Sequence, residues 1–152
     1  MTEQIDDRDG LTLLGQGKTD YPDSPDEAKL EAFENSHPNR DYWVEFDCPE
    51  FTALCPMTGQ PDFGHITIRY IPDAWCVESK SLKLYLFSFR NHGTFHEEVV
   101  NRILDDLVKT TQPRKAIVKG VFNPPGRLAM TAEPTYPRPE YHSASGGTDA
   151  TF

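Results

Sequence analysis

The feature that most limits the fold of this chain is one amphipathic stretch, residues 95–110. Its apolar residues recur at i, i+1, i+4, i+5, i+8 and i+9, and they are Val99, Val100, Ile103, Leu104, Leu107 and Val108. This spacing puts all six side chains on one face of an α-helix. Because such a face must be buried, the rest of the chain has to supply a sheet or another helix that covers it.

Alternating sequences on both sides of this helix predict the covering sheet. Residues 42–47 and 65–71 alternate apolar and polar side chains, which is typical of half-buried strands. After the helix, residues 115–122 and 128–131 are predicted as strands that flank a turn at 123–126.

Residues 82–90 fit the period of a strand and that of a helix, and the lack of a turn signal after Ser79 favours the helix. The order is then strand, strand, helix, helix, strand, strand (ββααββ). It predicts an α+β fold in which an antiparallel sheet carries both helices on one face.

The two ends of the chain are rich in residues that disfavour regular structure. Residues 1–38 are predicted to be a flexible acidic arm, with a possible short helix at 25–33. Residues 137–152 are predicted to be a flexible tail, because they combine proline with serine and glycine. The folded domain is therefore expected to span residues 39–136.

The formal net charge of -9 argues against a general nucleic-acid-binding protein, although a nucleotide-sized ligand needs only a local positive cluster. No apolar stretch has the length of a membrane span, and the acidic N-terminus does not resemble a secretory signal, so a cytoplasmic location is expected. The three cysteines are expected to be free thiols.

Cys55 is the candidate nucleophile. It lies in a segment, residues 48–63, whose prolines and glycine predict an irregular loop, and Asp62 follows seven residues later. A thiolate that attacks and a carboxylic acid that protonates the product could come from this pair. An equally compatible interpretation is that Cys55 is a small buried apolar residue and Asp62 caps a turn.

Two further patterns are ambiguous by themselves. Glu97 could accept hydrogen bonds from an amino-heterocycle, or it could complete a capping box with Thr94, with His96 as a surface residue. Lys80 and Lys83 could bind phosphate, or they could be the solvated face of a helix. The spacings of the cysteines and histidines match no common zinc pattern, so no metal site is predicted.

Three motifs, in this order, resemble the 7-cyano-7-deazaguanine reductases of the single-module type, the NADPH-dependent nitrile reductases of queuosine biosynthesis. They are Phe51-Thr-Ala-Leu-Cys55-Pro with Gln60-Pro-Asp62-Phe, then Glu78-Ser-Lys-Ser-Leu-Lys83-Leu, and then Phe95-His96-Glu97. The resemblance covers residues 40–122. It implies a tunnel fold whose barrel is completed by oligomerisation, as two stacked pentameric rings with ligand sites between subunits.

The resemblance also implies the chemistry and the residues that perform it. Cys55 would add to the nitrile as a thioimidate, Asp62 would donate the proton, and His96 would move protons or hold the substrate. Glu97 would bind the deazaguanine edge. The other implied residues are Val77, Glu78 and Ser79 for the substrate, and Ser79, Lys80 and Lys83 for NADPH.

The chain departs from the family at the turn after the third strand. The family carries an Arg-Gly-Gly type turn there, and this chain has Asn123-Pro-Pro-Gly126-Arg127. A proline has no backbone donor, so Arg127 is the candidate replacement contact to the cofactor. The alternatives are a cyclohydrolase-type purine or pterin enzyme of the same fold, which would need zinc, and a non-catalytic deazapurine-binding protein.

Overall fold

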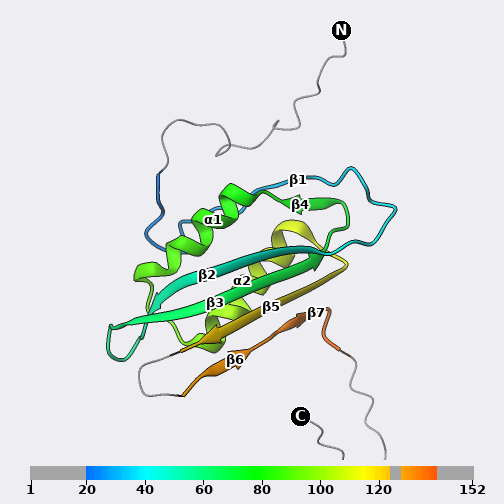
Figure 1. The fold of residues 1–152 in the computed structure, drawn as a ribbon. Coiled ribbons are helices and arrows are strands. Elements are labelled where there is room, and N and C mark those ends of the chain that lie inside the picture. Colours follow the sequence, from blue (N-terminus) through cyan, green and yellow to red (C-terminus); the bar gives the residue numbers. More distant parts are fainter. Residues whose placement is uncertain (1–19, 124–127, 140–152) are drawn as a thin grey trace, which may run out of the picture.

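The computed structural model describes residues 20–123 and 128–139 of the chain. Their main feature is an antiparallel sheet with strand order β2-β3-β5-β6, in which β7 also pairs with β5. The strands are β2 (Val44–Leu54), β3 (Pro61–Ile71), β5 (Lys115–Phe122), β6 (Met130–Ala132) and β7 (Thr135–Tyr136). Figure 1 shows β2, β3 and β5 as the long strands of this sheet.

Two helices follow β3 in the chain, α1 (Ser79–Phe87) and α2 (His96–Thr111), with a short 3₁₀ turn, η1 (Ser88–Asn91), between them. A separate two-stranded sheet pairs β1 (Ala32–Glu34) with β4 (Trp75–Val77). The predicted ββααββ order is therefore confirmed, with β1, β4 and β7 as additions.

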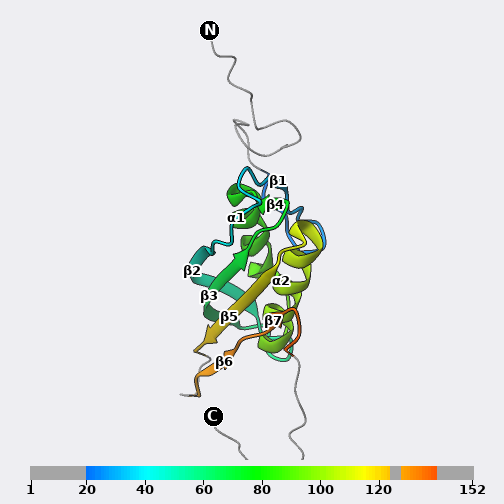
Figure 2. The ribbon, with the colours of Figure 1, turned by 90° about the vertical axis from the view of Figure 1, so that its right-hand side faces the viewer.

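One face of the sheet carries the core. Along β3 the side chains of Ile66, Ile68 and Tyr70 are at most 1% exposed, while those between them reach solvent. Residues of both helices belong to the same buried cluster, so both helices lie on this face, and Figure 2 shows α2 alongside the strands. The period of two in the strands thus decides which side chains meet the helices.

Helix α2 matches its prediction closely. Five of the six expected apolar residues are buried, and Val108 packs half-buried against the same cluster. The helix ends where Gln112 adopts a left-handed conformation and its N–H donates to the Val108 carbonyl.

The prediction that residues 48–63 form an irregular loop is wrong over most of its length. Strand β2 continues to Leu54 through a bulge between Cys48 and Phe51, and β3 already begins at Pro61. Proline is tolerated at both places, because Pro49 lies at a bulge of an edge strand and Pro61 is the first residue of its strand. The irregular part shrinks to residues 55–60.

The expected helix at 25–33 is also wrong, because this region forms a turn followed by strand β1. Residues 20–34 pack against the helices. Arg90 Nη1 donates to the Pro22 carbonyl at 2.8 Å, and Arg102 Nη2 donates to Asp26 Oδ1 at 2.5 Å. The division into an arm, a domain at 39–136 and a tail stays a prediction, since residues 1–19 and 140–152 lie outside the described residues.

The last predicted strand begins two residues later and ends one residue later than expected, at Met130–Ala132. Among the described residues, no helix has both the length and the apolar character needed to cross a membrane.

Leu107→Ala tests whether the apolar face of α2 anchors the fold. Leu107 is 1% exposed within the core, so the cavity should lower the free energy of unfolding by about 2–5 kcal/mol. Asp105→Ala is the matched control on the exposed face of the same helix and should change it by less than about 0.5 kcal/mol. Urea unfolding measures both variants, and equal losses would contradict the assignment.

Candidate active site

Cys55 lies at the tip of the β2–β3 hairpin, in a loop held by its own backbone. The Cys55 N–H donates to the Gln60 carbonyl at 2.8 Å, and the Gly59 N–H donates to the Cys55 carbonyl at 2.8 Å. Gly59 adopts φ +70°, which a residue without a side chain reaches without strain. The loop is therefore closed on itself, and the partly exposed thiol sits at a fixed place on a rigid hairpin.

A second backbone connection brings the start of α2 beside this loop. Leu54, the last residue of β2, pairs with Gly93 as a parallel bridge. The Leu54 N–H donates to the His92 carbonyl and the Thr94 N–H donates to the Leu54 carbonyl, both at 3.1 Å. Residues 95–97 are thereby attached next to Cys55, although some forty residues separate them in the sequence.

Asp62 and His96 meet on the core face of the sheet. Asp62 is the second residue of β3, and its side chain lies on the same face of the strand as the buried Ile66. It is 8% exposed. His96 Nε2 lies 3.2 Å from Asp62 Oδ2, although the two atoms are not aligned as a hydrogen bond. The site therefore places an imidazole and a carboxyl group together beneath the Cys55 loop.

The Cys55 loop favours the thiolate. Hydrogen bonds from the Thr58 hydroxyl, the Thr58 N–H and the Met57 N–H lower the pKa of the Cys55 thiol below its usual value. Burial and the charge of Asp62 act in the opposite direction and are outweighed. Cys48 differs, because burial raises the pKa of its thiol. Of the two, Cys55 is the one whose surroundings suit a nucleophile.

Glu97 does not form the capping box that its sequence allows. The N-cap of α2 is Phe95, and no side chain caps this end of the helix. Glu97 is exposed in the first turn, where a negative charge is favourable, and its carboxylate is open to a ligand. Phe95, two residues before Glu97, is 58% exposed, and its flat ring has no role among the predictions from sequence.

The residues of the second motif form a separate group at the start of α1. The Val77 N–H donates to the buried Tyr70 hydroxyl at 2.9 Å, which fixes the group near the end of β3. Glu78 is 3% exposed and caps α1, since its two carboxylate oxygens accept from the Lys80 and Ser81 N–H groups at 2.7 Å. Ser79 is exposed.

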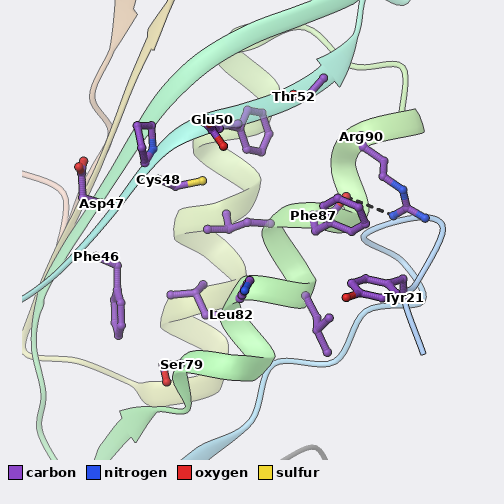
Figure 3. Close-up of a pocket in the computed structure, with 15 residues that line it drawn as sticks. Tyr21, Phe46, Asp47, Cys48, Glu50, Thr52, Ser79, Leu82, Phe87 and Arg90 are labelled. Atoms are coloured by element: carbon purple, nitrogen blue, oxygen red, sulfur yellow. Dashed lines mark hydrogen bonds between the residues drawn. The ribbon is translucent and has the colours of Figure 1, made fainter. Parts of the chain in front are cut away.

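A cavity of about 770 Å³ lies between β2 and α1, and Figure 3 shows Ser79, Leu82 and Phe87 on its helical wall. Ser79 and Lys83 line it, whereas Lys80 does not. Most of the wall is apolar, with Lys83 and Arg90 as its cationic groups. Cys55 and Asp62 are not among the lining residues, so this cavity is distinct from the Cys55 site.

The structure thus separates the predicted site residues into two groups. Cys55, Asp62, His96 and Glu97 gather at the beginning of β3, and Val77, Glu78 and Ser79 lie near its end. Asp62 and Tyr70 are eight residues apart on this strand, which corresponds to about 26 Å. Within one chain, the two groups do not form a common pocket.

Two remaining predictions concern Arg127 and a metal. Arg127 lies outside the described residues, so its proposed contact with the cofactor stays a prediction. Among the residues that the structure describes, no three His, Cys, Asp or Glu side chains are grouped as metal ligands would be.

Thr58→Ala tests the stabilisation of the thiolate by the loop. Loss of the hydroxyl should raise the Cys55 pKa, so alkylation of Cys55 should begin at a higher pH than in the unaltered protein. Thr58→Ser keeps the hydroxyl and should retain the original pH profile. Mass spectrometry of the Cys55 peptide after iodoacetamide treatment measures this, and identical profiles for all three proteins would refute the role of Thr58.

The chain is similar to a known protein family and to characterised proteins. The model of the family described as QueF-like protein matches residues 61–141. The NADPH-dependent 7-cyano-7-deazaguanine reductase of Bacteroides thetaiotaomicron is 57% identical over 87% of this chain and 87% of its own length. The protein of that name from Neisseria gonorrhoeae is 56% identical over 86% of this chain and 83% of its own.

A solved structure adds the fold. The crystal structure of the archaeosine synthase QueF-Like in its apo form matches with a TM-score of 0.55 and 21% identity, over 60% of this chain and 91% of that one. The resemblance inferred from the three sequence motifs is therefore confirmed, and the chain belongs to the QueF-like family of NADPH-dependent 7-cyano-7-deazaguanine reductases.

Proposed function

We propose that this protein reduces the nitrile of 7-cyano-7-deazaguanine (preQ0) to the amine 7-aminomethyl-7-deazaguanine (preQ1), within queuosine modification of tRNA. The observation that carries the proposal is the group formed by the Cys55 thiol, whose pKa is lowered, and the Asp62 and His96 side chains below it. The identity with reductases of that name supports the substrate.

The residues of this group fit the steps of a nitrile reduction. The Cys55 thiolate adds to the nitrile carbon, and the nitrile nitrogen takes a proton from Asp62, which gives a thioimidate. When the carbon has been reduced once, the C–S bond breaks, and Cys55 leaves as a thiolate from an imine. His96, 3.2 Å from Asp62, is placed to return the protons that the two reductions consume. Bound NADPH supplies one hydride to each reduction, so two NADPH are oxidised per amine.

Substrate recognition rests on Glu97 at the thiol end. Its exposed carboxylate accepts from the 2-amino and ring N–H groups of the deazaguanine, as a paired charge-assisted contact. At the other end, Val77, Glu78 and Ser79 complete the pocket. Glu78 can contribute only through lone pairs left over from its helix cap, because each of its oxygens already accepts one N–H.

The cofactor assignment rests on the α1 residues. Ser79 and Lys83 line the largely apolar cavity. Its wall carries two cations, Lys83 and Arg90, and two acids, Asp47 and Glu50, and the cations are the groups that a phosphate of the cofactor would contact. Lys80, one turn before Lys83, and Arg127 are the further candidate contacts. A cytoplasmic location is part of the same proposal.

We further propose that each site is shared by two copies of the chain in a ring-shaped homo-oligomer, two stacked pentamers forming a decamer. Asp62 lies at one group and Tyr70 contacts the other, and these two residues are about 26 Å apart along β3, which is more than a bicyclic base can bridge. In the described sheet, β2 is one edge, and β6 and β7 form the other. Two different open edges suit head-to-tail association, which closes into a ring.

NADPH oxidation with 7-cyano-7-deazaguanine tests the reaction. We expect turnover in the unaltered protein and none in Cys55→Ala, because the thioimidate cannot form without the thiol. Decreasing NADPH absorbance, with the amine identified by mass spectrometry, measures the reaction. Substrate binding without NADPH consumption in a folded oligomer would overturn the proposal and favour a binding protein.

Co-expression of two inactive variants tests the shared site. In the proposed shared site, one copy supplies the group with Cys55 and its neighbour supplies the group with Glu78. Cys55→Ala and Glu78→Ala alter different groups, so mixed oligomers should regain activity, with about one site in four intact after random mixing. Cys55→Ala with Glu97→Ala alters the same group and is the matched control, which should stay inactive. Equal activity of the two mixtures would contradict a site shared between copies.

A further inference from the structure

We propose that Phe122 is a positioning residue that fixes the orientation of the His96 ring. This inference rests on the proposed function, in which His96 moves protons beside Asp62. The two rings are stacked, with centroids 4.2 Å apart and planes inclined by only 5°. Phe122 is fully buried, so its ring is a fixed surface, while the His96 side chain is 15% exposed at the site.

The polar contacts of His96 do not determine its orientation. Its Nε2 atom is buried and has no hydrogen-bond partner within the described part of the chain, and the 3.2 Å approach to Asp62 is not aligned as one. The torsion that turns an imidazole about its Cβ–Cγ bond has broad preferences. The plane of the ring is therefore set by what it packs against, which is the face of Phe122.

Two glycines make room for the ring of Phe122. Gly64 is its cross-strand partner on β3, and Gly120 precedes it by two residues on the same face of β5. A Cβ atom on Gly64 would lie 2.7 Å from Phe122 Cδ1, and one on Gly120 would lie 2.7 Å from Phe122 Cε2. The ring thus occupies space that any other residue at these positions would fill.

An aromatic residue also contacts the Phe122 ring from β2. Phe51 meets the Phe122 ring edge-on, with centroids 6.4 Å apart. The Phe122 ring is therefore held by β2, β3 and its own strand. Since the His96 ring stacks on it, the sheet fixes the orientation of His96 through Phe122. If the Phe122 ring is removed, the imidazole can rotate and its Nε2 atom can leave Asp62.

Phe122→Leu tests this, with Phe89→Leu as the matched control. Both phenylalanines are 0% exposed, but Phe89 contacts His92, Phe51 and Tyr85, not His96. We expect Phe122→Leu to lower kcat roughly 10- to 100-fold with little change in KM, as for misplacement of a group that acts in the chemical step. Phe89→Leu should affect stability and leave kcat near its original value. Equal losses of kcat in the two variants would refute the proposal.

A double-mutant cycle shows whether Phe122 acts through His96. In a His96→Asn background, Phe122→Leu should cause little further loss of kcat, because the side chain that it positions is gone. A loss of the same factor in both backgrounds would refute the proposal.

A second measurement does not depend on turnover. In protein with isotopically labelled histidine, stacking on Phe122 should shift the NMR signals of the His96 ring protons upfield, and Phe122→Leu should remove that shift. An unchanged His96 signal would refute the stack even if the enzyme is active. If the unaltered protein has no reductase activity but the shift is lost in Phe122→Leu, the proposed function fails and the positioning of His96 by Phe122 stands.

Discussion

The site depends on the short stretch of backbone pairing between Leu54 and residues 92–94. These two hydrogen bonds join the end of β2 to the chain just before α2, and they do so without any side chain. The segment that carries Cys55 and the segment that carries His96 therefore lie side by side.

The fold was largely predictable because its signals are periodic. The spacing from Val99 to Val108 predicted α2, and the alternation from His65 to Ile71 predicted the C-terminal part of β3, where burial follows the same period. The prolines at 49 and 61 wrongly predicted a loop, because the cost of proline depends on whether a strand lies at the sheet edge, which is a tertiary property. Strand β1 was missed because, among the described residues, it pairs with β4 alone, more than forty residues further along the chain.

The candidate site was predictable only through short motifs, which name residues but not their arrangement. The first two motifs assign Cys55 and Glu78 to one site, but the structure places these residues near opposite ends of β3. Phe122 carried no signal at all, since a phenylalanine at a buried strand position is normally core. Its importance becomes visible only from the stacked ring of His96 and the two glycines that leave it space.

The electrostatics of the Cys55 loop suit the order of events that the chemistry needs. Local hydrogen bonds from Thr58 and Met57 lower the Cys55 pKa, while a negative charge on Asp62 raises it. A protonated Asp62 has no charge and does not raise the Cys55 pKa, so the thiolate is most favoured beside a neutral Asp62. An ionised Cys55 beside a protonated Asp62 is the state that the proposed mechanism uses for addition to the nitrile. In the proposed mechanism, transfer of that proton leaves an Asp62 carboxylate, whose charge again disfavours the free thiolate.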